Sequence, residues 1–400
     1  MVGFQYSRDG KIAAAGAAHQ KKLPKTAFSI DNFSILPYLV LFPISKETPV
    51  DFDTNNTTPR QEAITFSATG SEYFRIWIVN LLLSIVTLGI YSAWAKVRRN
   101  RYFYSSTHLA GSSFEYHGNA MAILKGRIAA LVIFGAYNLA FRVNLMAGLI
   151  MLAVMMAVMP WLIWKSLQFK LYNSSYRGIR FGFSGSSRKA YFIFLALPLL
   201  NLLTLGLMTP FLHQRLKRFQ HTESRFGSSH FSFNAPVGSF YGIYLKFIGM
   251  YLGGAVLATM LAAGLIFAVG NTNPDMMESS KFLPIALMGL VYLWMFFLLP
   301  YFIARLQNLV WNHTQLQGHT FESRMAWGRS ASIYITNVLA IIFTLGLFVP
   351  FAHVRWMKYR LESMTMVVDG NLDTFVAATQ EQVSAAGEGM VDLLDFDLSM

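Results

Sequence analysis

The sequence has no cysteine and few charged residues, and both absences exclude classes of function. A chain without cysteine has no disulfide, no thiolate nucleophile and no cysteine-ligated metal site. Charged residues make up 13% of the chain, whereas about a quarter of the residues of a soluble domain are charged. Hydrophobic residues make up 54%. This balance indicates a membrane protein.

Carboxylates are also missing from the long apolar stretches, which argues against a proton relay inside a membrane. The sequence has no Walker loop, no Gly-x-Ser-x-Gly nucleophile motif and no His-Glu-x-x-His zinc motif. We interpret the histidines as hydrogen-bonding groups at the membrane interface. The sequence therefore predicts no enzymatic activity, no cofactor and no metal site.

The net charge of +13 is compatible with binding to nucleic acid or to a membrane. Lys and Arg cluster at the ends of the apolar stretches, where the positive-inside rule and anionic headgroups place them. Their position predicts the lipid bilayer, and anionic lipids in particular, as the partner, and it argues against nucleic acid. The sequence is compatible with a homo-oligomer. It does not identify a small-molecule substrate.

Long apolar segments predict an all-α polytopic membrane protein. Two pairs, 122–141 with 145–164 and 240–267 with 282–303, are each long enough to cross a ~30 Å hydrocarbon core. Three further apolar segments share a Thr-Leu-Gly triplet and cover 73–95, 190–212 and 331–352. We expect internal repeats, each with a TLG segment, a helix pair and short β-hairpin-like elements on the cytoplasmic side. The predicted divisions are an N-terminal tail (1–63), repeat 1 (64–178), repeat 2 (179–317), a truncated repeat 3 (318–376) and an acidic C-terminal tail (377–400).

The three TLG segments agree beyond the triplet. An arginine stands eleven residues after each threonine, a cation fourteen residues after it, and an aromatic residue seven residues after it. Spacings of three and four residues place cations and a following aromatic on one helix face, which predicts a surface for anionic lipids. The candidate lipid-facing residues are Trp94, Arg98, Arg101, Arg215, Arg218, Arg355 and Lys358. The candidate bends are Thr87, Gly89, Thr204, Gly206, Thr344 and Gly346.

Asparagines inside the TLG segments are the candidate intramembrane polar groups: Asn80, Asn201 and Asn337. A buried amide is unfavourable unless it is hydrogen-bonded. These side chains either join helices or line a polar path at the repeat interface. Three stretches with a glycine between alternating aromatics, starting at Ser106, Asn173 and Asn312, predict the short hairpins.

The basic loops decide between two topologies for the TLG segments. If these segments cross the membrane, the basic loops 213–239 and 304–330 face outward. By contrast, the loops 142–144 and 270–281 contain one cation each. The positive-inside rule favours TLG segments that enter and leave on the cytoplasmic side. Most polar loops and the C-terminus are then cytoplasmic.

The stretch "GSEYFRIWIVNLLLSIVTLGIYSAWAKVRRNRYFYSSTHLAGSSFEYHG", Gly70 to Gly118, resembles the YjgN family of bacterial inner-membrane proteins. The later stretches "NSSYRGIRFGF" and "VDGNLDTF" are similar to the same family. The resemblance implies a multi-pass protein of the bacterial inner membrane and assigns no catalytic or ligand residue.

Two functions remain open from the sequence. In the first, a transporter or channel has a polar route at the repeat interface. In the second, a membrane module binds anionic lipids or protein partners through its cytoplasmic basic and aromatic faces. The sequence favours the first.

Overall fold

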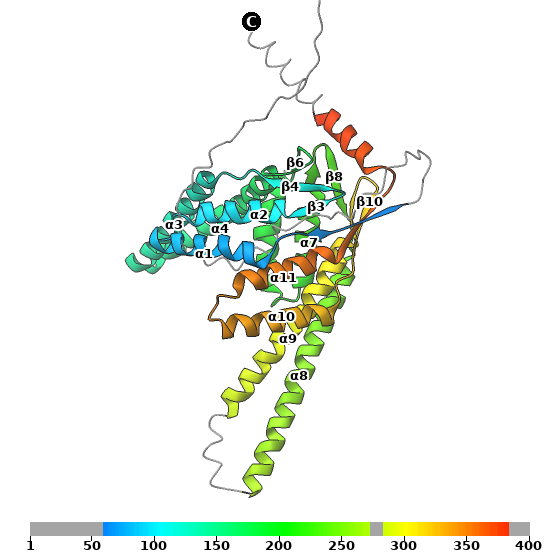
Figure 1. The fold of residues 1–400 in the computed structure, drawn as a ribbon. Coiled ribbons are helices and arrows are strands. Elements are labelled where there is room, and N and C mark those ends of the chain that lie inside the picture. The colour runs from blue at the N-terminus through cyan, green and yellow to red at the C-terminus, as the bar shows by residue number, and fades with distance from the viewer. Residues whose placement is uncertain (1–58, 273–282, 384–400) are drawn as a thin grey trace, which may run out of the picture.

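The computed structural model describes residues 59–272 and 283–383. Most of the two predicted tails lies outside these residues, although 377–383 complete a helix that begins at 372. The prediction of an all-α protein is wrong, because eleven strands form one large antiparallel sheet. Figure 1 shows helices beside and below this sheet.

The sheet nearly closes on itself like a barrel. The strands are β1 (Arg60–Ala63), β2 (Thr65–Phe66), β3 (Thr107–Leu109), β4 (Ser112–Tyr116), β5 (Ser174–Tyr176), β6 (Ile179–Phe183), β7 (Ser224–Phe226), β8 (Ser229–Phe233), β9 (Thr314–Leu316), β10 (His319–Ser323) and β11 (Met364–Val368). Their order is β1-β11-β10-β9-β8-β7-β6-β5-β4-β3-β2. Only Ile64 separates β1 from β2 in the chain, and its N–H donates to the carbonyl of Met364 at 3.3 Å. One short stretch of chain therefore joins the two ends of the sheet.

Four tight hairpins supply most of the strands. The turns after β3, β5 and β9 each have two residues with positive φ, ending in Gly111, Gly178 and Gly318. A type I′ turn requires this geometry. The sequence predicted these three hairpins and missed β7–β8, whose only turn residue with positive φ is Gly227. The joining of all four into one sheet was also missed, because strands of two to five residues carry little signal and pair between repeats.

Aromatic side chains fill the interior of the sheet. Neighbouring strands place Phe114 opposite Tyr176 and Phe181 opposite Phe226, with ring centroids 4.4 Å and 5.1 Å apart. These residues belong to one buried cluster. Such contacts stabilise a core and leave an aromatic interior in place of an open polar channel.

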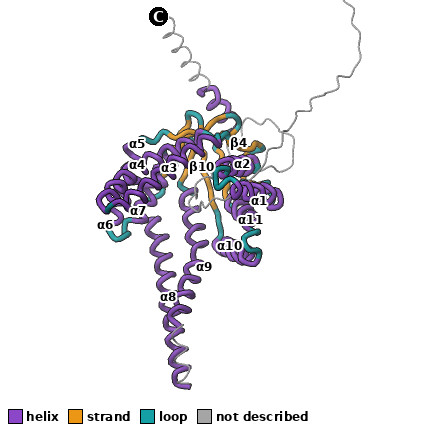
Figure 2. Tube along the Cα trace, turned by 90° about the vertical axis from the view of Figure 1, so that its left-hand side faces the viewer, coloured by secondary structure: helices purple, strands orange, loops and turns teal. Residues whose placement is uncertain are grey.

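The helices extend from this sheet. They are α1 (Gly70–Val86), α2 (Ser92–Ser105), α3 (Ala120–Val143), α4 (Leu145–Tyr172), α5 (Ser187–Tyr191), the π-helix η1 (Phe192–Ala196), α6 (Leu197–Leu203), α7 (Thr209–Thr222), α8 (Val237–Thr272), α9 (Leu283–Trp311), α10 (Trp327–Phe343) and α11 (Val349–Glu362). Among the described residues, α3, α4, α8 and α9 are long and apolar enough to cross a membrane. Both pairs begin and end next to strands, although they leave the sheet in different directions (Figures 1 and 2).

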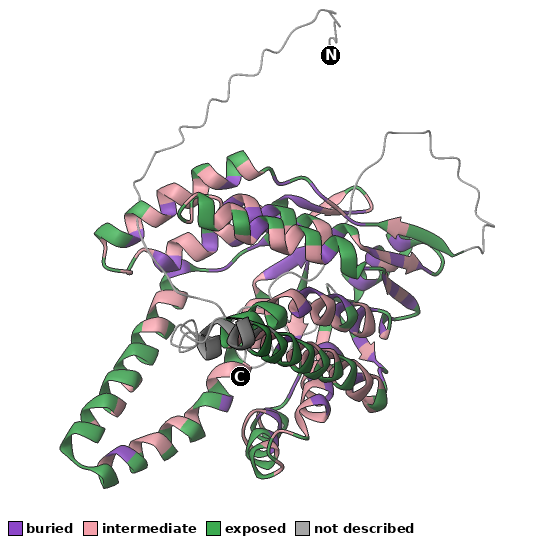
Figure 3. Ribbon diagram, turned by 90° about the horizontal axis from the view of Figure 1, so that it is seen from below, coloured by how far each residue is buried: buried purple, intermediate pink, exposed green. Residues whose placement is uncertain are grey.

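Burial is concentrated where helices meet the sheet. Figure 3 shows buried residues along the strands and the adjoining helix turns, whereas helix segments away from the sheet are largely exposed. A serine or threonine hydroxyl at the start of β5, β7 and β9 donates to the helix carbonyl four residues earlier. This bond fixes the last turn of α4, α7 and α9 against the sheet. These helix ends form the region described next.

Candidate anion site under the sheet

The TLG triplets form three tight turns of the same geometry. The leucine and glycine of each triplet have positive φ, with values of 49° and 90° at Leu88 and Gly89. The glycine N–H donates at 2.8 Å to the carbonyl five residues earlier in each copy, as in a Schellman cap. The hydroxyls of Thr87, Thr204 and Thr344 also donate to helix carbonyls. The helix therefore ends at the triplet, and the chain turns back.

The turns create three helical hairpins, which we call TLG hairpins 1, 2 and 3. Hairpin 1 is α1–α2, hairpin 2 is α5–η1–α6–α7, and hairpin 3 is α10–α11. Each hairpin follows one strand of the sheet and precedes another. The six candidate bends named above therefore lie at hairpin tips, and the basic helices α2, α7 and α11 return toward the sheet.

The three candidate asparagines are not brought together. Asn337 donates to the carbonyl of Ala352 at 3.1 Å and accepts from Arg355 at 2.9 Å, which joins α10 to α11. Asn201 accepts from the Thr209 hydroxyl at 3.3 Å within hairpin 2. The buried Oδ1 of Asn80 has no hydrogen-bond partner among the described residues. Each amide thus belongs to its own hairpin.

The candidate lipid-facing residues lie on α2, α7 and α11 and differ in exposure. Arg98, Arg101, Arg218, Arg355 and Lys358 are exposed. Two others have aromatic contacts: the Arg215 guanidinium lies 4.9 Å from the centre of the Phe211 ring, and Trp94 stacks on Tyr91. Whether these faces bind lipid stays a prediction.

A second set of cations, which the sequence analysis missed, lies on other faces of the same helices. It comprises Lys96, Arg99, Lys217 and Arg360, with Lys170 added by α4. Lys170 is within electrostatic range of Lys96 and Lys217, and Lys217 is within range of Arg360. The three-residue spacing of Lys96 and Arg99 could have indicated an additional helix face. The contribution of α4 has no signal in the sequence.

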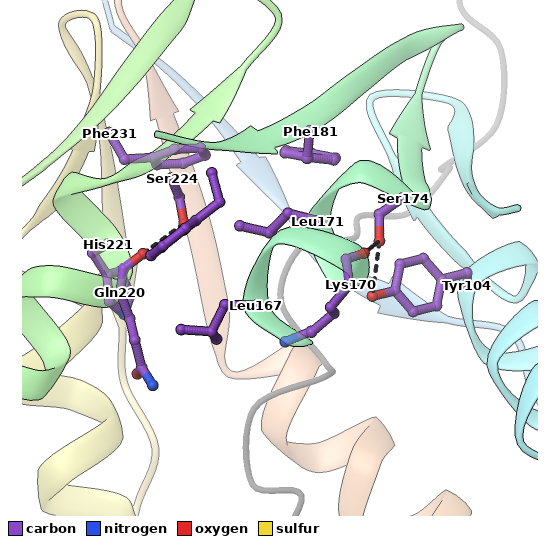
Figure 4. A pocket seen from close by; sticks show the side chains of 11 residues that line it. Tyr104, Leu167, Lys170, Leu171, Ser174, Phe181, Gln220, His221, Ser224 and Phe231 are labelled. Carbon is purple, nitrogen blue, oxygen red and sulfur yellow. Dashed lines mark hydrogen bonds between the residues drawn. The ribbon is translucent and has the colours of Figure 1, made fainter. Parts of the chain in front are cut away.

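A cavity of about 60 Å³ lies directly under the sheet at the ends of α4 and α7. Its lining residues are Tyr104, Leu167, Lys170, Leu171, Ser174, Phe181, Phe183, Gln220, His221, Ser224 and Phe231. In Figure 4 the Lys170 ammonium and the Gln220 amide point the same way, away from the strands. No acidic side chain lines it among the residues that the structure describes. We call the region around Lys170, Lys217 and Gln220 the cationic chamber.

The chamber has an unusual charge state. Burial and the nearby Arg360 lower the pKa of Lys217 to about 8. Burial, Lys217 and Lys170 lower the pKa of His221 to about 3, and burial and Lys217 lower the pKa of His213 to about 4. Both histidines are therefore neutral at pH 7, whereas Lys217, whose pKa lies above 7, carries a positive charge.

A buried cation without an acidic neighbour is unfavourable, and an entering anion would relieve this. Among the described residues, every charged group that shifts the pKa of Lys217 or His221 is a cation, and no carboxylate contributes. The side-chain carbonyl oxygen of Gln220, which lines the cavity, is buried without a hydrogen-bond partner among the described residues. The arrangement is suited to binding an anion that also carries hydrogen-bond donors. Among these residues, no group of three His, Asp or Glu side chains is placed to hold a metal.

The fold defines a class of protein with apolar helices extending from a barrel-like sheet and with cations gathered where they meet. Residues 61–393 match the family model described as "Bacterial protein of unknown function (DUF898)", and the chain belongs to this family. It is a membrane protein of unknown function.

Curated relatives carry the name "Inner membrane protein YjgN", so the predicted YjgN resemblance is confirmed. The chain is 32% identical to the protein of Salmonella typhimurium strain LT2 over 146 residues, which is 36% of each chain. It is 27% identical to the proteins of Escherichia coli O157:H7 and strain K12 over 142 residues, which is 35% of this chain and 36% of theirs. The match thus covers about a third of the length of these relatives. No solved structure matches.

Proposed function

We propose that the protein resides in the bacterial inner membrane and binds anionic lipids there, with the cationic chamber receiving the negatively charged headgroup. One observation carries this proposal: Lys170 and Lys217, from helices of different repeats, lie within electrostatic range of each other in a buried region with cationic neighbours. A phosphate group would compensate their charge, and the Gln220 carbonyl would accept from a headgroup hydroxyl.

The tips of the TLG hairpins support an association with the hydrocarbon phase. Leu88, Leu205 and Leu345 are 94%, 93% and 94% exposed, and other apolar side chains surround each of them. Exposed apolar clusters of this kind mark membrane or protein contacts. In this proposal the hairpins are re-entrant wedges that enter the bilayer from the side of the sheet and return to it.

A channel receives less support. The interior of the sheet is filled by aromatic rings, and the three asparagines that a shared polar route would need lie in separate hairpins. Lipid binding uses the buried cations directly and needs no continuous pore. Movement of the bound lipid between leaflets is a further step that the proposal does not include.

The test compares two variants that lose the same formal charge. Lys170→Met with Lys217→Met removes two cations of the chamber, and Arg218→Met with Lys358→Met removes two exposed cations from α7 and α11. Purified full-length protein in nanodiscs is titrated with phosphatidylglycerol in a phosphatidylcholine background, and retained lipid is counted by native mass spectrometry. We expect the chamber variant to lose at least about tenfold in affinity, equivalent to ~1.4 kcal/mol.

We expect the exposed-face variant to change affinity less than about threefold, because solvent and salt screen exposed charges. Equal losses in the two variants would assign binding to general surface charge and overturn the chamber. An unchanged affinity for phosphatidylglycerol in the chamber variant, with its fold verified by circular dichroism, would overturn it as well.

A further inference from the structure

TLG hairpin 1 contains a second and larger cavity, which shares no lining residue with the one under the sheet. Its volume is about 340 Å³, and it lies between α1, α2, α3 and α11. Its lining residues are Tyr73, Trp77, Asn80, Leu81, Ser84, Ser92, Ala95, Lys96, Arg99, Arg127, Val349 and His353. We call it the hairpin cavity. Its size falls in the range typical of small-molecule sites, roughly 300–1,000 Å³.

The charged lining of the hairpin cavity is suited to a phosphate. Lys96, Arg99 and Arg127 come from two helices, and none of the described residues that line the cavity is acidic. Arg127 donates to the Ser92 hydroxyl, which in turn donates to the Gly89 carbonyl. This chain of bonds connects the guanidinium to the turn of hairpin 1. Two guanidinium groups can bind phosphate oxygens in a fork geometry that a single ammonium cannot provide.

The polar lining indicates what the phosphate is attached to. Asn80 is 7% exposed and lines the cavity, and its Oδ1 has no hydrogen-bond partner among the described residues. This oxygen is an acceptor, so a fully ionised phosphate cannot satisfy it, whereas a ligand hydroxyl can. The side chains of Tyr73 and Trp77 give the same cavity an aromatic wall, against which the C–H groups of a polyol can pack.

The other two hairpins show that this site is particular to hairpin 1. The residues of hairpin 2 and α8 that correspond to Asn80, Lys96, Arg99 and Arg127 are Leu197, His213, Leu216 and Tyr244. His213 Nδ1 and the Tyr244 hydroxyl are hydrogen-bonded at 2.8 Å, so the two polar side chains satisfy each other. In hairpin 3, Trp356 stands at the position of Arg99, and Asn337 is already hydrogen-bonded.

We propose that the hairpin cavity binds a phosphate monoester or diester of a small polyol, such as a phosphoglycerol group. Lys96, Arg99 and Arg127 hold the phosphate, and the Asn80 Oδ1 accepts from a polyol hydroxyl. The ligand is either a lipid headgroup or a free phosphate ester, because both present the same chemistry to the cavity. The proposal does not depend on lipid binding in the cationic chamber.

The test converts hairpin 1 to the residues of hairpin 2. The variant Lys96→His/Arg99→Leu/Arg127→Tyr uses side chains that the fold already accommodates at corresponding positions, which favours its folding. Full-length protein is titrated by calorimetry in detergent with sn-glycerol 3-phosphate, inorganic phosphate and glycerol. In a parallel arm, nanodiscs with phosphatidylglycerol are compared with nanodiscs of phosphatidylcholine alone.

We expect binding of sn-glycerol 3-phosphate or of phosphatidylglycerol by the native protein, and a loss of at least about tenfold in the triple variant. Binding of the free ester identifies a water-soluble ligand, and binding only in nanodiscs identifies a lipid; both support the site. Asn80→Leu should reduce the preference for the glycerol ester over inorganic phosphate and leave phosphate binding in place.

The exposed-face variant Arg218→Met/Lys358→Met is the control for general charge and should keep the binding that the triple variant loses. In the nanodisc arm, Lys170→Met/Lys217→Met removes the contribution of the cationic chamber. Phosphatidylglycerol that this double variant still binds, and that the triple variant in the same background loses, is bound in the hairpin cavity. The proposal is overturned if neither ligand binds, or if glycerol binds as well as its phosphate ester. It is also overturned if the triple variant, shown to be folded by its thermal transition, binds like the native protein.

Discussion

TLG hairpins 1 and 2 have the same turn but different interiors. Both end a helix at a Thr-Leu-Gly triplet with the same pair of positive φ angles. Hairpin 1 lines a cavity with three cations, whereas hairpin 2 fills the corresponding positions with leucines and a His213–Tyr244 hydrogen bond. The turn is thus a property of the repeat, and the binding chemistry is a property of one copy.

The largest effect should come from the buried asparagines, whose surroundings differ between hairpins. Asn337→Leu removes two hydrogen bonds, one of them from Arg355, and should lower the free energy of unfolding by about 2–3 kcal/mol. Asn80→Leu removes an oxygen that has no partner among the described residues, and should be neutral or stabilising by up to about 1 kcal/mol. Thermal and denaturant unfolding in detergent measure both.

A destabilisation of Asn80→Leu as large as that of Asn337→Leu would show that Asn80 has a structural role. The contrast between a binding hairpin and a structural hairpin would then fail.

The next effect concerns the turn that the hairpins share. Ala at position 89 or 346 would have to adopt φ near 90°, although no atom within 4 Å opposes its Cβ. The left-handed conformation costs an L-residue about 1–2 kcal/mol, so Gly89→Ala and Gly346→Ala should each lower the free energy of unfolding by that amount. The matched control is Gly126→Ala inside α3, which has open space and an ordinary helical φ, and which should stabilise by up to about 1 kcal/mol. Unequal losses at positions 89 and 346 would contradict a common turn.

These turns also show how far the sequence predicts the structure. Three copies of one triplet marked the turns, and the length of the apolar segments marked the four long helices. The sheet was not predictable in the same way, because Arg60 pairs with Val368 across nearly the whole chain and each strand is short. Spacing alone indicated the exposed cations, but the inward cations depend on which helix face packs against the sheet. Of the candidate sites, only Asn80 lines the hairpin cavity.

A smaller effect should appear with pH and distinguish hairpins 2 and 3 from hairpin 1. His213 and His353, which correspond to Lys96, have pKa values lowered to about 4 and about 3, in both cases mainly by burial. The unfolded chain therefore binds protons near pH 6.5 that the folded chain does not, and stability should fall as the pH drops below about 6.5. Each histidine contributes at most about 1.4 kcal/mol per pH unit.

Unfolding of native protein and of His213→Gln at pH 7.5 and 5.5 measures this contribution. When the pH falls from 7.5 to 5.5, the free energy of unfolding should decrease by about 1 kcal/mol less in the variant than in the native protein. If the free energy of unfolding of His213→Gln depends on pH as strongly as that of the native protein, His213 is charged in the folded protein.

The smallest effects should come from the exposed cations, which occupy one corresponding position in the three hairpins: Arg101, Arg218 and Lys358. Only Lys358 has an acidic partner on its own helix, Glu362, at 3.7 Å and four residues away. Exposed ion pairs of this kind contribute about 0.3–0.5 kcal/mol. Replacement of each cation by alanine should therefore change the free energy of unfolding by less than about 0.5 kcal/mol. The change should be slightly larger for Lys358→Ala than for the other two replacements. Added salt should remove that difference. Two outcomes would contradict the distinction between exposed and buried cations. One is a loss above 1 kcal/mol in the free energy of unfolding at any of the three positions. The other is a loss of phosphatidylglycerol binding as great as in Lys170→Met/Lys217→Met.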